Sequence, residues 1–171
     1  SKPPLFHWVG AVIGSASGGV SELVARLPSH LAALGILLCV ALCAYALSKR
    51  SRTTESNLYC ERAALLSAGV LSLTYGFHQL AAQAMVDMVF SLCVWGAIAS
   101  VVCGAKSEDA PRTLLSARAR SAFWLFCALA VLARGPLGLV LPVFLTFIGG
   151  AWVVGVRSTF RELSRPSVGW L

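Results

Sequence analysis

The longest stretch with almost no charge lies between Arg62 and Lys106, where Asp87 is the only charged residue. A helix of roughly 20 apolar residues, rising about 1.5 Å per residue, crosses a hydrocarbon core of about 30 Å. The stretch is therefore long enough to cross a membrane twice. A turn near residues 79–84 would leave Asp87 just inside the start of the returning helix, at one membrane face.

Asp87 has two interpretations at that position. A charge at mid-bilayer costs several kcal/mol, so a membrane face is where a carboxylate is tolerated. In the first interpretation Asp87 is a solvated turn residue without a further role. In the second it is a carboxylate aimed into a cavity at that face, and we favour this functional interpretation.

The charged fraction of the whole chain supports a membrane protein. Only 12% of the 171 residues are charged and 57% are hydrophobic, whereas soluble domains carry about 25% charged residues. The net charge of +7 does not indicate nucleic-acid binding, because the basic residues lie between apolar stretches. Orientation in the membrane explains them better.

The apolar stretches predict an all-α fold, a polytopic membrane helix bundle forming a single domain over residues 1–171. Residues 1–30 are expected to form outer-face juxtamembrane helices, including an interfacial helix around Trp8 and a short helix before Pro28. Proline and glycine after Arg134 are expected to end the fourth span. About five transmembrane helices are expected, at 31–48, 63–82, 86–105, 121–134 and 137–156.

The distribution of basic residues orients the bundle. Eleven of the fourteen Lys and Arg residues lie in three loops, at 49–62, 106–120 and 157–165. The positive-inside rule places these loops in the cytoplasm. The other three are Lys2, Arg26 and Arg134. These three therefore lie at the outer face together with Asp87.

Cations at a lipid–water boundary suit an anionic lipid headgroup, because Lys and Arg bind phosphate oxygens. Lys2, Arg134 and Arg26 are therefore candidate phosphate-binding residues. Each has a plainer alternative. Lys2 would be a terminal lysine without a ligand, Arg134 would snorkel to the headgroups, and Arg26 would pair with Glu22 four residues earlier.

Several motifs carry a resemblance to a known family. Lys2-Pro3-Pro4-Leu5 is followed by Trp8, Ser21-Glu22 and Ala25-Arg26-Leu27-Pro28-Ser29, and later by Val86-Asp87-Met88 and Leu132-Ala133-Arg134-Gly135-Pro136-Leu137-Gly138-Leu139. In this order they resemble the polyprenyl-phosphate-dependent glycosyltransferases. These are multi-spanning GT-C enzymes related to protein mannosyltransferases and the lipid A aminoarabinose transferase. Arg134 stands where this family usually has Lys.

The resemblance implies transfer of a sugar from a polyprenyl-phosphate carrier to a lipid or protein acceptor at the outer face of a bacterial inner membrane. Lys2 and Arg134 would stabilise the phosphate leaving group. Asp87 would support catalysis by orienting the acceptor or a divalent metal ion. No cofactor is certain, and the metal ligands are unknown.

The departures from the family leave an alternative open. The family's catalytic aspartate lies in an outer loop upstream of Lys2 and is not in this chain, so we expect an amino-terminal-half fragment and leave enzymatic activity uncertain. The alternative is a non-catalytic membrane subunit, derived from such an enzyme and packed against other membrane subunits. A transporter is disfavoured, because it would need polar residues deep within the spans, and those found there are limited to Ser, Thr and Gln.

Thiol labelling in intact cells tests the predicted orientation. In a background without native cysteines, a membrane-impermeant maleimide should modify Ala84→Cys at the outer face and should miss Ser56→Cys in the first cytoplasmic loop. Labelling of Ser56→Cys from outside would reverse the orientation and remove the shared outer face.

Overall fold

The computed structural model describes residues 8, 11–12, 14–15, 22–51, 57–83, 86–105 and 115–153. Lys2 and the carboxy-terminal end of the expected fifth span lie outside them, as does most of the expected interfacial helix. The described chain is all-helical, as predicted, and its one bridge between extended residues joins Ala105 to Leu115. The helices are α2 (Glu22–Ser51), α3 (Asn57–Ser72), α4 (Tyr75–Ala82), α5 (Val86–Gly104), α6 (Ala117–Arg134) and α7 (Leu137–Val153).

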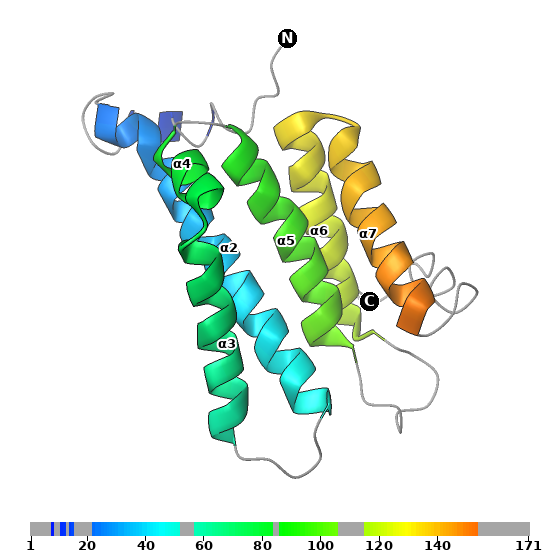
Figure 1. Ribbon diagram of the computed structural model, residues 1–171. Coiled ribbons are helices and arrows are strands. Elements are labelled where there is room, and N and C mark those ends of the chain that lie inside the picture. The colour runs from blue at the N-terminus through cyan, green and yellow to red at the C-terminus, as the bar shows by residue number, and fades with distance from the viewer. Residues whose placement is uncertain are drawn as a thin grey trace.

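The long helices form a bundle in which the chain runs alternately down and up (Figure 1). α2, α5 and α7 run in one direction, and α3 and α6 return. α5 is the central helix, because it contacts α2 on one side and α6 and α7 on the other. α3 packs mainly against α2, so it forms the edge of the bundle.

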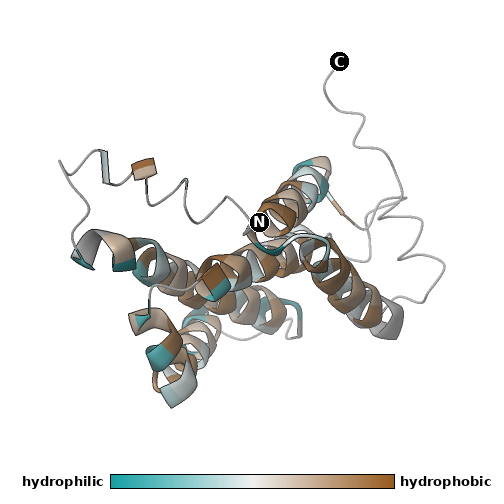
Figure 2. Cartoon of the chain, turned by 90° about the horizontal axis from the view of Figure 1, so that it is seen from above, coloured by the Kyte–Doolittle hydropathy of each residue, from teal (hydrophilic) through white to brown (hydrophobic). Residues whose placement is uncertain are grey.

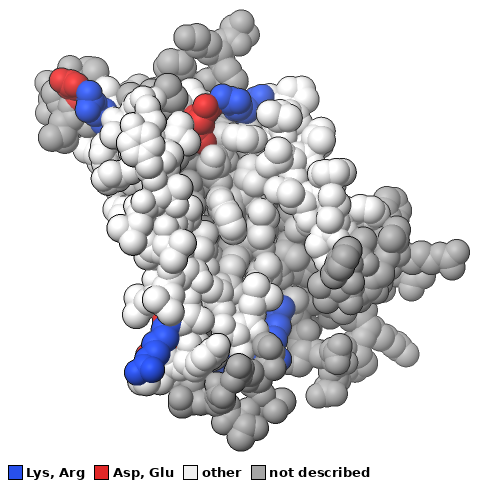
Figure 3. Space-filling model, viewed as in Figure 1, with Lys and Arg blue, Asp and Glu red and all other residues white. Residues whose placement is uncertain are grey.

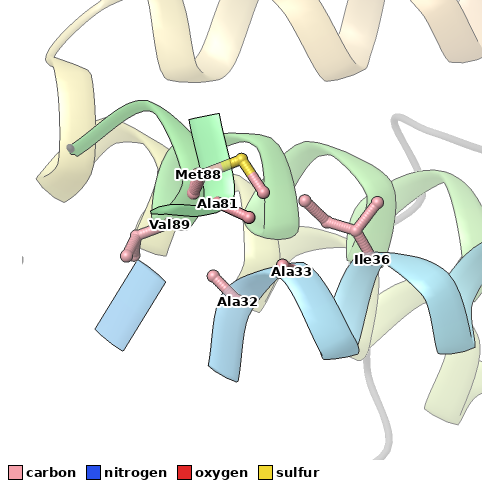
Figure 4. Close-up of a cluster of buried hydrophobic side chains, with 6 residues drawn as sticks. All are labelled: Ala32, Ala33, Ile36, Ala81, Met88 and Val89. Carbon is pink, nitrogen blue, oxygen red and sulfur yellow. The ribbon is translucent and has the colours of Figure 1, made fainter. Parts of the chain in front are cut away.

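Two clusters of buried side chains join the helices to α5. The first joins α2, α4 and α5 through Ala32, Ala33, Ile36, Ala81, Met88 and Val89 (Figure 4). The second joins α5 to α6 through Ala97, Phe123 and Cys127. Alanine dominates the α2 side of the first cluster, which lets the two backbones approach closely. Small residues are the usual means of helix contact where lipid removes most of the hydrophobic driving force.

Glycines mark the closest contacts between helices. A side chain at Gly96 would collide with the ring of Phe126, and one at Gly35 would collide with Leu92. At Gly138 a methyl group would run into the backbone of Ala130, which cannot move aside as a side chain can. The sequence analysis did not identify these glycines as packing positions.

The start of α2 differs from the prediction. We expected a short helix before Pro28 and a separate span from residue 31, but one helix runs from Glu22 to Ser51 with Pro28 in its second turn. Proline removes one backbone donor, which here would have bonded to the carbonyl of residue 24. Pro28 and Ser29 are both buried, and the packing of these two residues offsets the lost bond.

The expected span over 63–82 is divided into α3 and α4. Thr74 has extended backbone angles, φ −71° and ψ 121°. The hydroxyl of Ser72 donates to the carbonyl of Gly69 at 2.8 Å, and that of Thr74 donates to the carbonyl of Val70 at 3.2 Å. Such side-chain bonds compete with the helical backbone ladder. Hydroxyls close together therefore weaken the helix at this break.

Length and composition make two helices candidates for crossing a membrane. They are Ala25–Arg50 within α2 and Val86–Gly104, and a shorter apolar helix covers Leu137–Gly149. Leu31, Leu34, Leu38 and Leu42 on α2 are exposed, so its outward face is apolar. Figure 2 shows that hydrophobic residues make up most of the helical ribbon and that hydrophilic residues are few.

The close contact at Gly138 predicts a specific loss of stability. Gly138→Ala should lower the free energy of unfolding in detergent by about 1–3 kcal/mol, the usual range for overpacking. Gly69→Ala is the matched control, since nothing lies within 4 Å of its added methyl group. It should be neutral or raise stability by up to about 1 kcal/mol through helix propensity. Equal effects would mean that α6 and α7 do not pack at Gly138.

Candidate functional site at the Asp87 end of the bundle

The described charges lie at the two ends of the bundle, and the surface between them is uncharged in the view of Figure 3. The amino end of α2, the amino end of α5 and the carboxyl end of α6 meet at one end (Figure 1). That end carries Glu22, Arg26, Asp87 and Arg134. The opposite end carries Lys49, Arg50, Glu61, Arg62, Arg118 and Arg120.

Asp87 and Arg134 form an ion pair that joins two neighbouring helices. Nη2 of Arg134 donates to Oδ1 of Asp87. Asp87 lies in the first turn of α5 and Arg134 in the last turn of α6. An acid at a helix amino end and a base at a carboxyl end both complement the helix dipole. Asp87 is thus just inside its helix, as predicted, but it is a paired side chain and not an isolated turn residue.

The pair is open to its surroundings. The side chain of Arg134 is 44% exposed and that of Asp87 is 39% exposed. Coulomb attraction between partly exposed charges is weakened by solvent, and such pairs are typically worth about 0–1 kcal/mol. The pair can therefore be broken by a competing ligand without a large loss of stability.

Phe90 is a third member of the site, and the sequence analysis did not identify it. The guanidinium carbon of Arg134 lies 5.9 Å from the centre of the Phe90 ring, within range of a cation–π contact. Phe90 is three residues after Asp87, so both side chains lie on the same face of α5. The sequence alone shows that Asp87 and Phe90 share a helix face. It does not show that Arg134 of α6 lies against that face, so Phe90 could not be assigned to the site without the structure.

A tight turn sets the position of Arg134. The sequence predicted that the helix ends at Arg134-Gly135-Pro136, and α6 does end there, with α7 beginning at Leu137. Gly135 has φ 73° and ψ −149°, a combination essentially restricted to glycine. Its N–H donates to the carbonyl of Val131 at 2.6 Å. Gly135 thus closes the end of α6 with Arg134 as the last helical residue.

Arg26 is not brought into this pair. Its Nη2 lies 2.5 Å from Oε1 of Glu22, one turn earlier on α2, so the plainer alternative for Arg26 holds in the structure. Its backbone carbonyl also lies 2.9 Å from Nδ1 of His30. Lys2, the remaining candidate, lies outside the described residues.

At the opposite end, basic side chains contribute to the architecture. Arg50, in the last turn of α2, donates to the carbonyl of Ala105 just after α5, at 2.5 Å. Ser116 donates its N–H to the carbonyl of Gly104 at 3.2 Å and caps α6 with its side chain. These bonds tie the ends of α2, α5 and α6 together.

The described residues do not fit a metal centre. No group of three or more His, Cys, Asp or Glu side chains among them is arranged to hold an ion. In the described part of the chain, Asp87 forms its ion pair with the cation Arg134. The positive charge of Arg134 disfavours binding of a divalent cation to the same carboxylate. We therefore derive no chemical step through a metal.

Comparison of the chain with protein-family models, curated proteins and solved structures finds no match.

A double-mutant cycle measures the strength of the pair. Asp87→Asn, Arg134→Gln and the double variant should give a coupling of about 0.2–1 kcal/mol in the free energy of unfolding, the range for exposed pairs. Denaturation of the purified protein in detergent is the assay. A coupling above about 3 kcal/mol would contradict this view, because it is typical of a buried structural bridge.

Proposed function

We propose that this chain is a polytopic protein of a bacterial inner membrane, with about five spans and its basic loops in the cytoplasm. The confinement of the described charges to the two ends supports this proposal, as do the two long apolar helices. In this orientation the end that carries Asp87 and Arg134 faces outward.

The proposed ligand of the outer end is the phosphate of a polyprenyl-phosphate carrier. The single observation that carries this proposal is a half-exposed arginine at the end of an apolar bundle, held between Asp87 and Phe90. A guanidinium can bind two phosphate oxygens at once. Exposed apolar side chains follow Arg134 at the start of α7, among them Leu137 and Val140, and they suit the polyprenyl chain. Arg26, paired with Glu22, remains a secondary candidate, and Lys2 remains an expectation.

The proposed activity is that of a GT-C glycosyltransferase, or of its amino-terminal part. In the reaction an acceptor hydroxyl attacks the anomeric carbon, the bond to the carrier phosphate breaks, and the phosphate leaves with the bonding electrons. Arg134 would stabilise the negative charge that develops on that phosphate. Asp87 would accept a hydrogen bond from the acceptor hydroxyl and orient it, while the general base would be the family's outer-loop aspartate. The motifs that resemble the family support this proposal.

The alternative, a non-catalytic membrane subunit, has one observation in its favour. Arg134 already has a partner within the chain, and an ion pair that only joins α5 to α6 would be sufficient for a structural role. The two proposals differ in whether Arg134 also binds phosphate.

Substitution of Arg134 tests phosphate binding. Arg134→Gln should weaken binding of a short-chain polyprenyl phosphate by about 1.5–3 kcal/mol, the usual contribution of a hydrogen bond to a charged group. Arg134→Lys should retain measurable binding, because the charge remains while the fork geometry is lost. The assay is binding to the purified protein by calorimetry or fluorescence.

Two controls complete this test. The unphosphorylated polyprenol should compete poorly if the phosphate is recognised. Arg118→Gln, at the opposite end of the bundle, should leave carrier binding unchanged. Equal binding by Arg134→Gln and the wild-type protein would remove the phosphate site and favour the non-catalytic subunit.

A further inference from the structure

We propose that Asp87 is an internal counter-anion, which occupies Arg134 in the absence of carrier and is displaced when the carrier phosphate binds. This inference rests on the phosphate site proposed above and concerns the regulation of that site. The Asp87–Arg134 ion pair would then be the resting state of the site, closed by the protein's own carboxylate.

The contact itself can be exchanged. It joins one guanidinium nitrogen, Nη2, to one carboxylate oxygen, Oδ1. A guanidinium has five N–H donors in a fork that matches phosphate oxygens. A polyprenyl phosphate without its sugar is a phosphate monoester, which carries more negative charge than a carboxylate and has three terminal acceptor oxygens. Because both side chains are partly exposed, the phosphate can approach Arg134 before Asp87 has left.

Phe90 can keep the Arg134 side chain in position while phosphate replaces Asp87. The ring contacts the guanidinium of Arg134 independently of Asp87, and the turn at Gly135 holds the end of α6. When the carboxylate leaves, Arg134 therefore retains two constraints on its position. A cation in contact with an aromatic ring still has its edge N–H donors free for an anion.

Displacement also changes what Asp87 can do. A carboxylate paired with arginine is a weak acceptor for a neutral hydroxyl, because its charge is already compensated. Once released, the carboxylate of Asp87 is repelled by the bound phosphate and turns away from Arg134, and its oxygens are then free to accept a hydrogen bond from the acceptor hydroxyl. Carrier binding would therefore precede and prepare the orientation of the acceptor hydroxyl, which gives an ordered binding sequence.

Carrier affinity in four proteins tests this exchange. The probe is a short-chain polyprenyl phosphate, titrated into the wild-type protein, Asp87→Asn, Arg134→Gln and the double variant in detergent. Removing a competitor that forms an exposed pair should tighten binding by Asp87→Asn about two- to fivefold. In the Arg134→Gln background the same change should have no effect, because there is no guanidinium for Asp87 to occupy.

Two further variants complete the set. Glu61→Gln removes the same charge at the opposite end of the bundle and should leave the affinity unchanged. Asp87→Ser also removes the carboxylate and should tighten carrier binding about two- to fivefold, as Asp87→Asn does. Helical circular dichroism and gel filtration confirm that each variant is folded, and Asp87→Ser keeps the test decisive if the Asn variant is not.

The outcomes separate the two proposals. If Arg134→Gln loses binding but Asp87→Asn binds no more tightly than the wild-type protein, the phosphate site stands and the counter-anion is wrong. Tighter binding by Asp87→Asn in both backgrounds would also overturn it, since the effect would then be general electrostatics. If Arg134→Gln binds like the wild-type protein, the phosphate site itself falls.

A competition arm identifies the source of the phosphate. Inorganic phosphate should displace the lipid probe only weakly if the polyprenyl chain contributes to binding. Displacement at equal concentration would assign the site to free phosphate, with the exchange between Asp87 and phosphate unchanged.

Discussion

The exclusion of charge from the middle of the bundle is the constraint on which the rest of the structure depends. A charged side chain among apolar helices is costly unless it is paired or reaches a polar boundary. The described acids and bases accordingly lie towards helix ends, and most of them are exposed there; Nε of Arg120 is an exception, since it is buried without a hydrogen-bond partner. The antiparallel course of the chain then brings the ends of distant segments together, which is how residues 87 and 134 meet.

The Asp87–Arg134 ion pair is compatible with two roles, a structural link between α5 and α6 and the resting state of an anion-binding site. It matches both helix dipoles and joins α5 to α6, yet its exposure keeps it weak. A weak ion pair adds little to stability but is a suitable resting state for an anion site. It keeps Arg134 in position, and it neutralises the charge of Arg134 only in part. The Phe90 contact adds a constraint that does not depend on Asp87. Arg26 differs in this respect, since its partner Glu22 belongs to the same helix.

Much of the fold could be predicted from hydrophobic pattern and helix-breaking residues. The start of α5 near Asp87 and the turn at Gly135 both lie where the sequence placed them. The local signals failed at Pro28, where one helix continues through the proline and Pro28 and Ser29 are both buried. They failed again near Thr74, where hydroxyl groups divide an apolar stretch into two helices. In both places local hydrogen bonds or packing decided where the helix ends, and the apolar composition of the segment did not.

The sequence by itself determined the class of fold, the end of the bundle at which each charge lies, and the candidates for an outer-face site. These follow from the cost of burying charge and from the alternation of apolar and basic segments, which need no knowledge of packing. Only the tertiary structure decided that Arg134 pairs with Asp87, that Arg26 does not, and that Phe90 belongs to the site. The relative position of α5 and α6 depends on close contacts of small residues such as Ala97 and Gly96, and such contacts leave no periodic signal in the chain.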